Sequence, residues 1–212
     1  MPSASRPSMR LPAPRLGRGK SLAECLRRRR TIREISKRKL PPQLLSNLLW
    51  AACGTNRRKG PFGHAGITAA SASSSQEIDV YVALEDGVHR FDAERHRLVP
   101  VTAGDQRALA IGRGQRDVVT MQAPVQLIYV ADVHRLTHTR GFQEPGLHDA
   151  DVQKSYYYVD TGLIAANVYL FAASQGLACW FHNCDRPALA DKLKLRPEQQ
   201  VLFAQSVGYP ER

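Results

Sequence analysis

The chain has no apolar run that approaches the ~20 residues needed to cross a bilayer, and residues 1–20 lack the apolar core of a secretory signal. Cysteine is scarce, and no two cysteines form a CxxC pair. Their spacing suits neither a zinc site nor a dense disulfide framework. We therefore expect reduced thiols and a cytoplasmic protein. The four cysteines are Cys25, Cys53, Cys179 and Cys184.

Several catalytic signatures are absent as well. Residues 110–115 contain GxG but lack the third glycine of a dinucleotide fingerprint, and no Walker loop or GxSxG motif occurs. There is no HExxH, and His134 and His138 have no third ligand close in sequence, so we expect no metal site. Cys184 lies near His182, but close neighbours in sequence seldom point at one another, and a buried cysteine is usually inert.

The positive charge is concentrated at one end of the chain. The net charge is +11; residues 1–40 hold 13 Lys and Arg against two Asp and Glu, whereas residues 41–212 hold 17 of each kind. A nucleic-acid-binding protein usually spreads a basic face over its fold. A non-enzymatic nucleic-acid binder that uses residues 1–40 stays open as an alternative, supported by this local charge alone. The prolines and basic residues of 1–20 predict an extended basic arm, either solvated or crossing onto a partner subunit.

Hydrophobic periodicity predicts one α+β domain over residues 21–212, with a mostly antiparallel sheet flanked by helices, because few βαβ units follow one another. Ser21 and Glu24 have the form of a capping box that starts the first helix. Residues 54–75 and 134–150 have no period and are expected to be loops. The parts at 57–67 and 134–150 are expected to shape the substrate site. Helices are expected at 21–30, 41–53, 105–121, 155–175 and 185–193, and strands at 78–84, 88–91, 97–101, 123–132 and 201–207.

A run of guanidinium groups follows the first helix. Arg29-Arg30-Thr31-Ile32-Arg33 places three of them and one hydroxyl within five residues. Guanidinium forks donate two parallel hydrogen bonds and keep their charge, so the run suits an anionic ligand such as a phosphate. Arg27 and Arg28 have a simpler interpretation, because cations favour the negative end of a helix dipole and need no ligand there.

This run and the motifs that follow it resemble, in order and spacing, the nitroreductase family of FMN-dependent oxidoreductases. Residues 29–35 are similar to that family's RRSxRxF signature, and residues 71–76 are similar to its PSxxNxQ loop. The resemblance covers about residues 20 to 210 and looks closest to the short branch related to the azoline-oxidising dehydrogenases of peptide biosynthesis. Further matches are residues 44–56, Asp160-Thr161-Gly162 with Ala166-Asn167, Gly176-Leu177, Trp180-Phe181 and Val207-Gly208-Tyr209-Pro210.

The resemblance implies a role for each matched site residue. Arg29, Arg30 and Thr31 would hold the FMN phosphate and ribityl chain. Arg33 would lie near the pyrimidine edge, where a cation stabilises the anionic reduced flavin. Arg212 would add a phosphate contact. The other implied contacts are Ser71, Ala72, Ser74 and Gln76 from the partner subunit, and the backbone of Phe181, His182 and Asn183 on the flavin N5 side.

The resemblance also implies an intertwined homodimer with the flavin at its interface. Apolar Leu163 and Leu170, with small Ala166 and Ala173, would let two long helices approach closely. Hydride would pass from NAD(P)H through FMN to a small organic acceptor such as a nitroaromatic or a quinone, with no essential protein acid or base. A flavin oxidase or dehydrogenase that acts on an azoline-like organic substrate stays open as the alternative.

The sequence departs from the family pattern at four positions. Thr31 replaces a serine but keeps the hydroxyl, and Ile35 replaces an aromatic residue. Ala70 stands where a proline is expected. Ser74 stands where an asparagine is expected, which removes an amide able to donate and accept at once. We expect the change at Ser74 to weaken the contact with the flavin ring.

Overall fold

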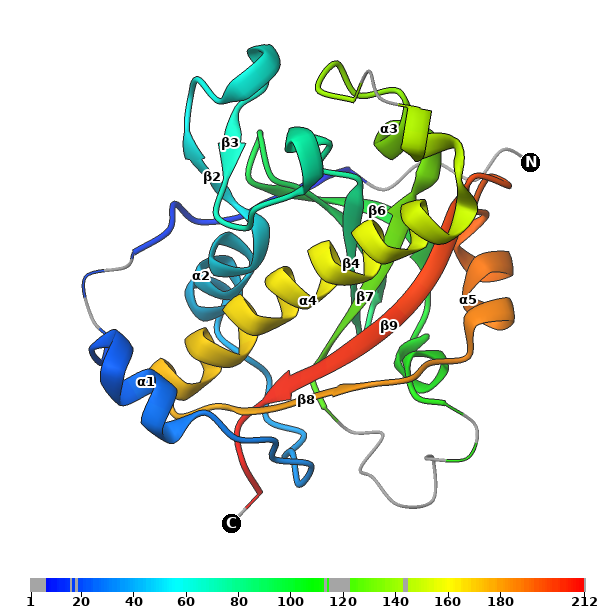
Figure 1. Ribbon diagram of the computed structural model, residues 1–212. Helices are drawn as coiled ribbons and strands as arrows, with labels where there is room; N and C mark the ends of the chain where they lie inside the picture. Colours follow the sequence, from blue (N-terminus) through cyan, green and yellow to red (C-terminus); the bar gives the residue numbers. More distant parts are fainter. Residues whose placement is uncertain are drawn as a thin grey trace.

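A seven-stranded antiparallel sheet forms the centre of the molecule (Figure 1), in the strand order β1-β6-β5-β4-β7-β9-β8. The computed structural model describes residues 7–15, 17, 19–112, 114, 123–142 and 145–211. The predicted α+β class with a mostly antiparallel sheet is confirmed. The strands are β1 Met9–Arg10, β4 Ile78–Leu84, β5 Gly87–Asp92, β6 Arg97–Ala103, β7 Val125–Asp132, β8 Ala178–His182 and β9 Gln199–Gly208, with β2 Thr55–Arg57 and β3 Gly66–Ile67 in a separate hairpin.

Helices cover both faces of this sheet. α2 (Pro42–Cys53) and α4 (Ala150–Gln175) pack on one face, and α5 (Arg186–Leu193) packs on the other. No helix among the described residues is both long enough and apolar enough to span a membrane. The remaining helical elements are α1 Leu22–Arg28, α3 Val133–Thr137 and the single 3-10 turns η1 Pro61–Gly63, η2 Ala72–Ser74, η3 Arg107–Ala110 and η5 Pro145–His148.

The central strand β7 shows why both faces of the sheet need a cover. All of its residues are buried, and successive side chains of a strand point to opposite faces. Leu127 and Tyr129 pack in the same apolar cluster as Leu48 of α2. Ile128 and Val130 pack in the cluster that contains residues of α5. A strand buried on both faces reads as a continuous apolar run, which is the pattern that predicted it.

The long helix α4 runs across the sheet and organises what lies around it. It begins at Ala150, because the Asp149 carboxylate accepts hydrogen bonds from two N–H groups of the first turn at 2.8 and 3.1 Å. The prediction placed its start at Ser155 and missed this cap. The helix ends, as predicted, at Gly176, whose φ of 69° lies in the left-handed region that favours glycine.

Three stretches differ from their predicted structure. The helix expected at 105–121 is wrong where the structure describes it, since η3 is a single turn and residues 115–122 lie outside the described residues. The glycines at 112 and 114 disfavour a helix there. The stretch 54–75 carries the β2–β3 hairpin and two short turns, and the stretch 134–150 is partly α3 and η5. β1 and β8 were not predicted as strands.

The described part of the basic arm packs on its own chain. β1 pairs with β6, and Leu11 is buried. The Ser46 hydroxyl donates to the Pro12 carbonyl at 2.6 Å, and the Asn47 side-chain amide donates to the Arg15 carbonyl at 2.8 Å. These contacts attach residues 9–15 to α2 and to the edge of the sheet.

Candidate functional site

The arginine run, residues 29–33, lies along β8, which is an edge strand of the sheet. The Ile32 N–H donates to the Cys179 carbonyl at 3.0 Å. Ile35 is almost fully buried and forms a bridge with Pro210, which follows β9. These contacts cover backbone groups at an edge that would otherwise be open. These contacts therefore hold the run along this edge of the sheet.

Tyr169 of α4 brings three predicted site residues together. Its hydroxyl lies 3.1 Å from Thr31 Oγ1 and accepts the Phe181 N–H at 2.9 Å. The Arg29 guanidinium carbon lies 5.6 Å from the centre of the same ring, within the range of a cation–π contact. One tyrosine thus connects α4, the arginine run and β8. No local pattern around residue 169 indicated this role.

A cavity of about 500 Å³ opens beside the arginine run. The Glu24 carboxylate pairs with Arg27 at 2.7 Å and also with Arg28, and these partners hold the pKa of Glu24 below its usual range. Among the residues that the structure describes, Arg29 and Arg30 make no ion pair, so their charge is available to an anion. The cavity is lined by Arg27, Arg28, Arg29, Arg30, Ile32, Ala173, Gly176, Leu177 and Pro210.

Arg33 points to a different neighbour. Its guanidinium carbon lies 5.7 Å from the ring centre of Trp180 on β8, and it does not line the cavity. Because Arg33 is exposed and the structure describes no ion pair for it, it offers a third cation along the same edge, after Arg29 and Arg30. The predicted Arg212 lies outside the described residues.

The backbone of β8 is only partly open to a ligand. The Phe181 N–H is engaged by Tyr169, and the Asn183 carbonyl accepts the Gly112 N–H at 3.1 Å. His182 is buried, with Nε2 2.8 Å from Ser206 Oγ and Nδ1 2.9 Å from the Asn183 carbonyl. Burial lowers the pKa of His182 to about 4, so its ring is neutral at ordinary pH. Burial also raises the pKa of the Cys184 thiol to about 11, which does not suit a nucleophile.

The second group of predicted residues, 71–76, forms a tight turn held by its own hydrogen bonds. The Ser71 hydroxyl accepts the Gln76 N–H at 3.0 Å, and the Gln76 amide donates to the Ala65 carbonyl at 2.7 Å. Ser74 and Gln76 have φ values of 56° and 49°, a backbone region that costs energy for residues other than glycine. The Ala72 N–H donates to the Asp160 carboxylate of α4 at 2.8 Å.

The structure does not bring the two groups together within one chain. Residues 71–76 are attached at Asp160 and the arginine run at Tyr169, nine residues further along α4. Nine residues of α-helix span about 14 Å. Figure 1 shows the 71–76 turn and the arginine run toward opposite ends of this helix. Within one chain, the two groups therefore lie at separate places along α4.

The Nitroreductase family model matches residues 26–209, which covers the arginine run, α4 and β8. The chain belongs to the nitroreductase family. A relative from Methanocaldococcus jannaschii with a provisional nitroreductase name is 30% identical over 168 residues, 74% of this chain and 75% of that protein. The predicted family is therefore confirmed, while the azoline-oxidising branch stays a prediction.

Solved structures carry the same fold. A crystal structure from Ralstonia eutropha JMP134, also given provisionally as a nitroreductase, has a TM-score of 0.84 and 32% identity over 99% of this chain and 92% of that one. The NADPH:FMN oxidoreductase of Vibrio harveyi, solved with NAD+, has a TM-score of 0.60 and 19% identity over 90% of this chain and 69% of that one. At that identity the second likeness shows the fold alone.

A buried carboxyl pair in this nitroreductase-family chain was missed by the sequence analysis. Glu77 is fully buried at the start of β4, and the Ser75 hydroxyl donates to its Oε2 at 2.6 Å. Burial raises the pKa of Glu77 to about 7, and burial also raises the pKa of Asp160, which faces it. Protonation of Glu77 removes the charge that burial disfavours. The contact that fastens the 71–76 turn to α4 is the hydrogen bond from the Ala72 N–H to the Asp160 carboxylate.

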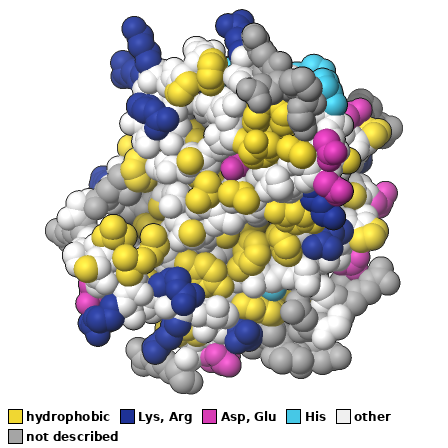
Figure 2. All heavy atoms as spheres, in the orientation of Figure 1, with side chains coloured by type: hydrophobic (Ala, Val, Ile, Leu, Met, Phe, Trp, Pro, Cys, Tyr) yellow, Lys and Arg dark blue, Asp and Glu magenta, His cyan; other side chains and the backbone are white. Residues whose placement is uncertain are grey.

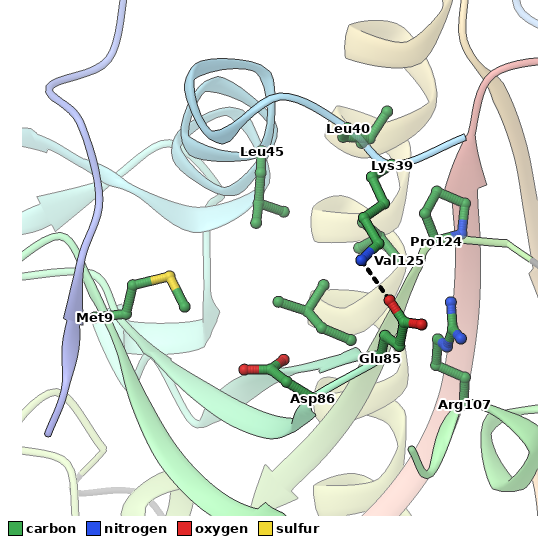
Figure 3. Close-up of a pocket in the computed structure, with 10 residues that line it drawn as sticks. Met9, Lys39, Leu40, Leu45, Glu85, Asp86, Arg107, Pro124 and Val125 are labelled. Carbon is green, nitrogen blue, oxygen red and sulfur yellow. Dashed lines mark ion pairs between the residues drawn. The ribbon is translucent and has the colours of Figure 1, made fainter. Parts of the chain in front are cut away.

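A separate cavity of about 400 Å³ lies between the arm and the β4–β5 turn (Figure 3). Lys39 and Glu85 point toward one another there and form an ion pair. None of the predicted site residues lines this cavity, so it is distinct from the candidate site of the nitroreductase-family chain. It is lined by Met9, Lys39, Leu40, Leu45, Leu84, Glu85, Asp86, Arg107, Pro124 and Val125.

Proposed function

We propose that this protein is an FMN-dependent oxidoreductase that transfers hydride from NAD(P)H to a small organic acceptor such as a nitroaromatic or a quinone. The observation that carries the proposal is the pair Arg29 and Arg30, exposed and without an ion pair in the described part of the chain, beside a cavity of about 500 Å³. Membership of the nitroreductase family supports a redox activity. The name of the Vibrio harveyi structure supports the choice of cofactor and donor.

The residues present fit the groups of this cofactor. Arg29 and Arg30 would bind the phosphate, since guanidinium groups pair well with phosphate oxygens. Thr31, oriented by Tyr169, would meet the ribityl hydroxyl groups. Arg33 would lie near the pyrimidine edge, where its charge favours the anionic reduced flavin. FMN supplies the hydride-transfer chemistry when bound, and the protein orients it and excludes water.

We also propose a homodimer that completes this site across a two-fold axis. Figure 2 shows hydrophobic side chains gathered over α4 and β9 on one face of the molecule. On α4, Val159 is 60% exposed and Leu163 is 41% exposed. Ala166, one turn further along the helix, is exposed as well. Packing this row against the same row of a second copy would bury it. The partner's 71–76 turn, with Ser71, Ala72, Ser74 and Gln76, would then reach the arginine run and the 181–183 backbone.

A visible absorption spectrum of the purified protein tests the proposal. A flavin band that bleaches when NADPH is added under nitrogen is the expected result. A flavin that bleaches only with an organic substrate would instead support the oxidase or dehydrogenase alternative. A colourless protein that takes up no added FMN would overturn a flavin function of either kind.

A further inference from the structure

A second polar cavity lies beside the 71–76 turn, on the side of α3. Its volume is about 470 Å³. The lining contains two arginines and three histidines, and none of the described residues that line it is acidic. Because residues 41–212 carry equal numbers of acidic and basic side chains, this is a local excess of cationic groups. The lining residues are His64, Ser74, Ser75, Gln76, His134, Arg135, His138, Thr139 and Arg140.

The cations of this cavity are not equally available. Arg135 lies 3.1 Å from the Asp79 carboxylate and donates to the Glu77 carbonyl at 2.9 Å, so its charge is already neutralised. Arg140 is exposed and makes no ion pair with any described residue. It is therefore the cation that an incoming anion would meet.

Two histidines form the wall next to Arg140. The rings of His134 and His138 are stacked, with centres 3.9 Å apart and planes 9° apart. His138 Nδ1 lies 2.9 Å from the His134 carbonyl, so its proton is donated there. Its Nε2 is then a hydrogen-bond acceptor in the neutral ring, so the donor that remains in this wall for an anion is the Arg140 guanidinium.

A cavity of about 330 Å³ with more apolar lining residues adjoins the polar cavity of about 470 Å³. The two cavities share Ser74 and Gln76. The lining of the smaller cavity includes the apolar side chains of Phe62 and Ile67. It also includes Arg57, whose guanidinium donates to Asn56 Oδ1 and to the Ile67 carbonyl. The segment after α3 closes directly on this cavity, since a Cβ at Gly141 would lie 2.6 Å from Ser73 Cβ and 2.9 Å from the Phe62 ring. One molecule could place an apolar body in one cavity and a charged group in the other, across the Ser74–Gln76 ridge.

We propose that the organic substrate of this enzyme is an anion, with an apolar or aromatic body against Phe62 and Ile67 and a carboxylate or phosphate beside Arg140. The inference rests on the proposed function, because the 71–76 turn would face the flavin of the partner subunit. Two substrates could supply the same anionic chemistry: the hydride acceptor through a carboxylate, or NADPH through its additional phosphate. Kinetics of the two half-reactions distinguish these sources.

The test compares matched substrates in the wild type, in Arg140→Gln and in the control Lys59→Gln. Lys59 is an exposed cation that lines neither cavity. 4-Nitrobenzoate carries a carboxylate where 4-nitrobenzamide carries an uncharged amide of similar size, and NADPH carries one phosphate more than NADH. Loss of one charge-assisted hydrogen bond predicts that one of the two kcat/KM ratios, charged over uncharged acceptor or NADPH over NADH, falls about tenfold in Arg140→Gln. Lys59→Gln should leave both ratios as they are.

A calorimetric titration gives a readout that does not depend on turnover. If the acceptor is the source, the Kd of 4-nitrobenzoate rises about tenfold in Arg140→Gln, and if the donor is the source, the Kd of NADPH does. A flavin-containing enzyme in which Arg140→Gln changes neither ratio and neither Kd would overturn the inference. A wild type that takes up no FMN overturns the proposed function instead, and the two titrations then still decide whether the anion site exists.

Discussion

The Tyr169 hydroxyl lies 3.1 Å from Thr31 Oγ1. Among the described residues, this is the only hydrogen bond between α4 and a side chain of the arginine run. The same hydroxyl accepts the Phe181 N–H at 2.9 Å. A hydroxyl can donate one hydrogen bond and accept two, so Tyr169 can donate to Thr31 while it accepts from Phe181. This orients the arginine run on the surface where the cofactor is proposed to bind.

Tyr169→Phe should therefore weaken flavin binding while it keeps the ring under Arg29. Removing the hydroxyl leaves the Phe181 N–H without its acceptor, which costs about 1–3 kcal/mol, and it releases Thr31. We expect the Kd of FMN to rise about tenfold, measured by quenching of flavin fluorescence. Tyr156→Phe on the same helix is the control, because the described contact of Tyr156 is ring packing with Phe142. An unchanged Kd in Tyr169→Phe would show that Thr31 is held by other contacts.

The arginines should divide into two functional pairs. Arg29→Ala with Arg33→Ala is expected to abolish flavin retention, because two charge-assisted hydrogen bonds of about 1.5–3 kcal/mol each correspond to at least a hundredfold in Kd. Far-ultraviolet circular dichroism should stay that of the wild type. Arg27→Ala with Arg28→Ala removes the same amount of charge. This variant should retain most of the flavin, because Arg27 and Arg28 pair with Glu24 in the wild type. Equal losses in the two double variants would mean that net charge alone matters.

The sequence predicted the elements whose pattern is local and strong. The apolar run of β7, the Gly176 end of α4 and the Ser21 cap of α1 all appear in the structure, although only half of the expected capping box forms. The Ser21 hydroxyl accepts the Glu24 N–H at 3.3 Å, while the Glu24 carboxylate turns to Arg27 and Arg28. β8 was missed because it is short and pairs with one strand only, so its pattern is weak.

The site was predicted as far as its parts lie in short motifs. The arginine run and the 71–76 turn are each contiguous in sequence and could be recognised. Tyr169 could not, because its role depends on Thr31, which is 138 positions away in the chain. Glu77 could not either, since its partner Asp160 belongs to α4, and nothing next to Glu77 in sequence signals burial. Contacts between segments that are far apart in the chain leave no periodic pattern in the local sequence.

Glu77 should make the stability of the protein depend on pH. Its pKa is raised to about 7 by burial, so the folded state binds a proton that the unfolded state releases nearer pH 4.5. The stabilisation is thus complete below the unfolded pKa and is lost as the pH rises through about 7, by about 2–3 kcal/mol. Urea unfolding at about pH 5 and about pH 8 measures this loss.

Glu77→Gln should reduce that dependence, because glutamine can accept the hydrogen bond from Ser75 and does not titrate. We expect the variant to be more stable than the wild type at about pH 8 and close to it at about pH 5. Glu94→Gln is the control, since Glu94 is exposed and the substitution removes the same charge. A wild type and a Glu77→Gln variant with parallel pH profiles would contradict the raised pKa of Glu77.

Heterodimers should show whether one flavin site draws on two chains. One chain carries Arg29→Ala with Arg33→Ala, and the other carries Ser74→Gly with Gln76→Gly, where glycine suits the positive φ values. Each homodimer should bind little flavin. In a heterodimer purified through two affinity tags, a site shared between chains gives one intact site and one doubly altered site, so about half of the wild-type flavin should bind. A site built within one chain would be defective in both halves, and the heterodimer would then bind no more flavin than either homodimer.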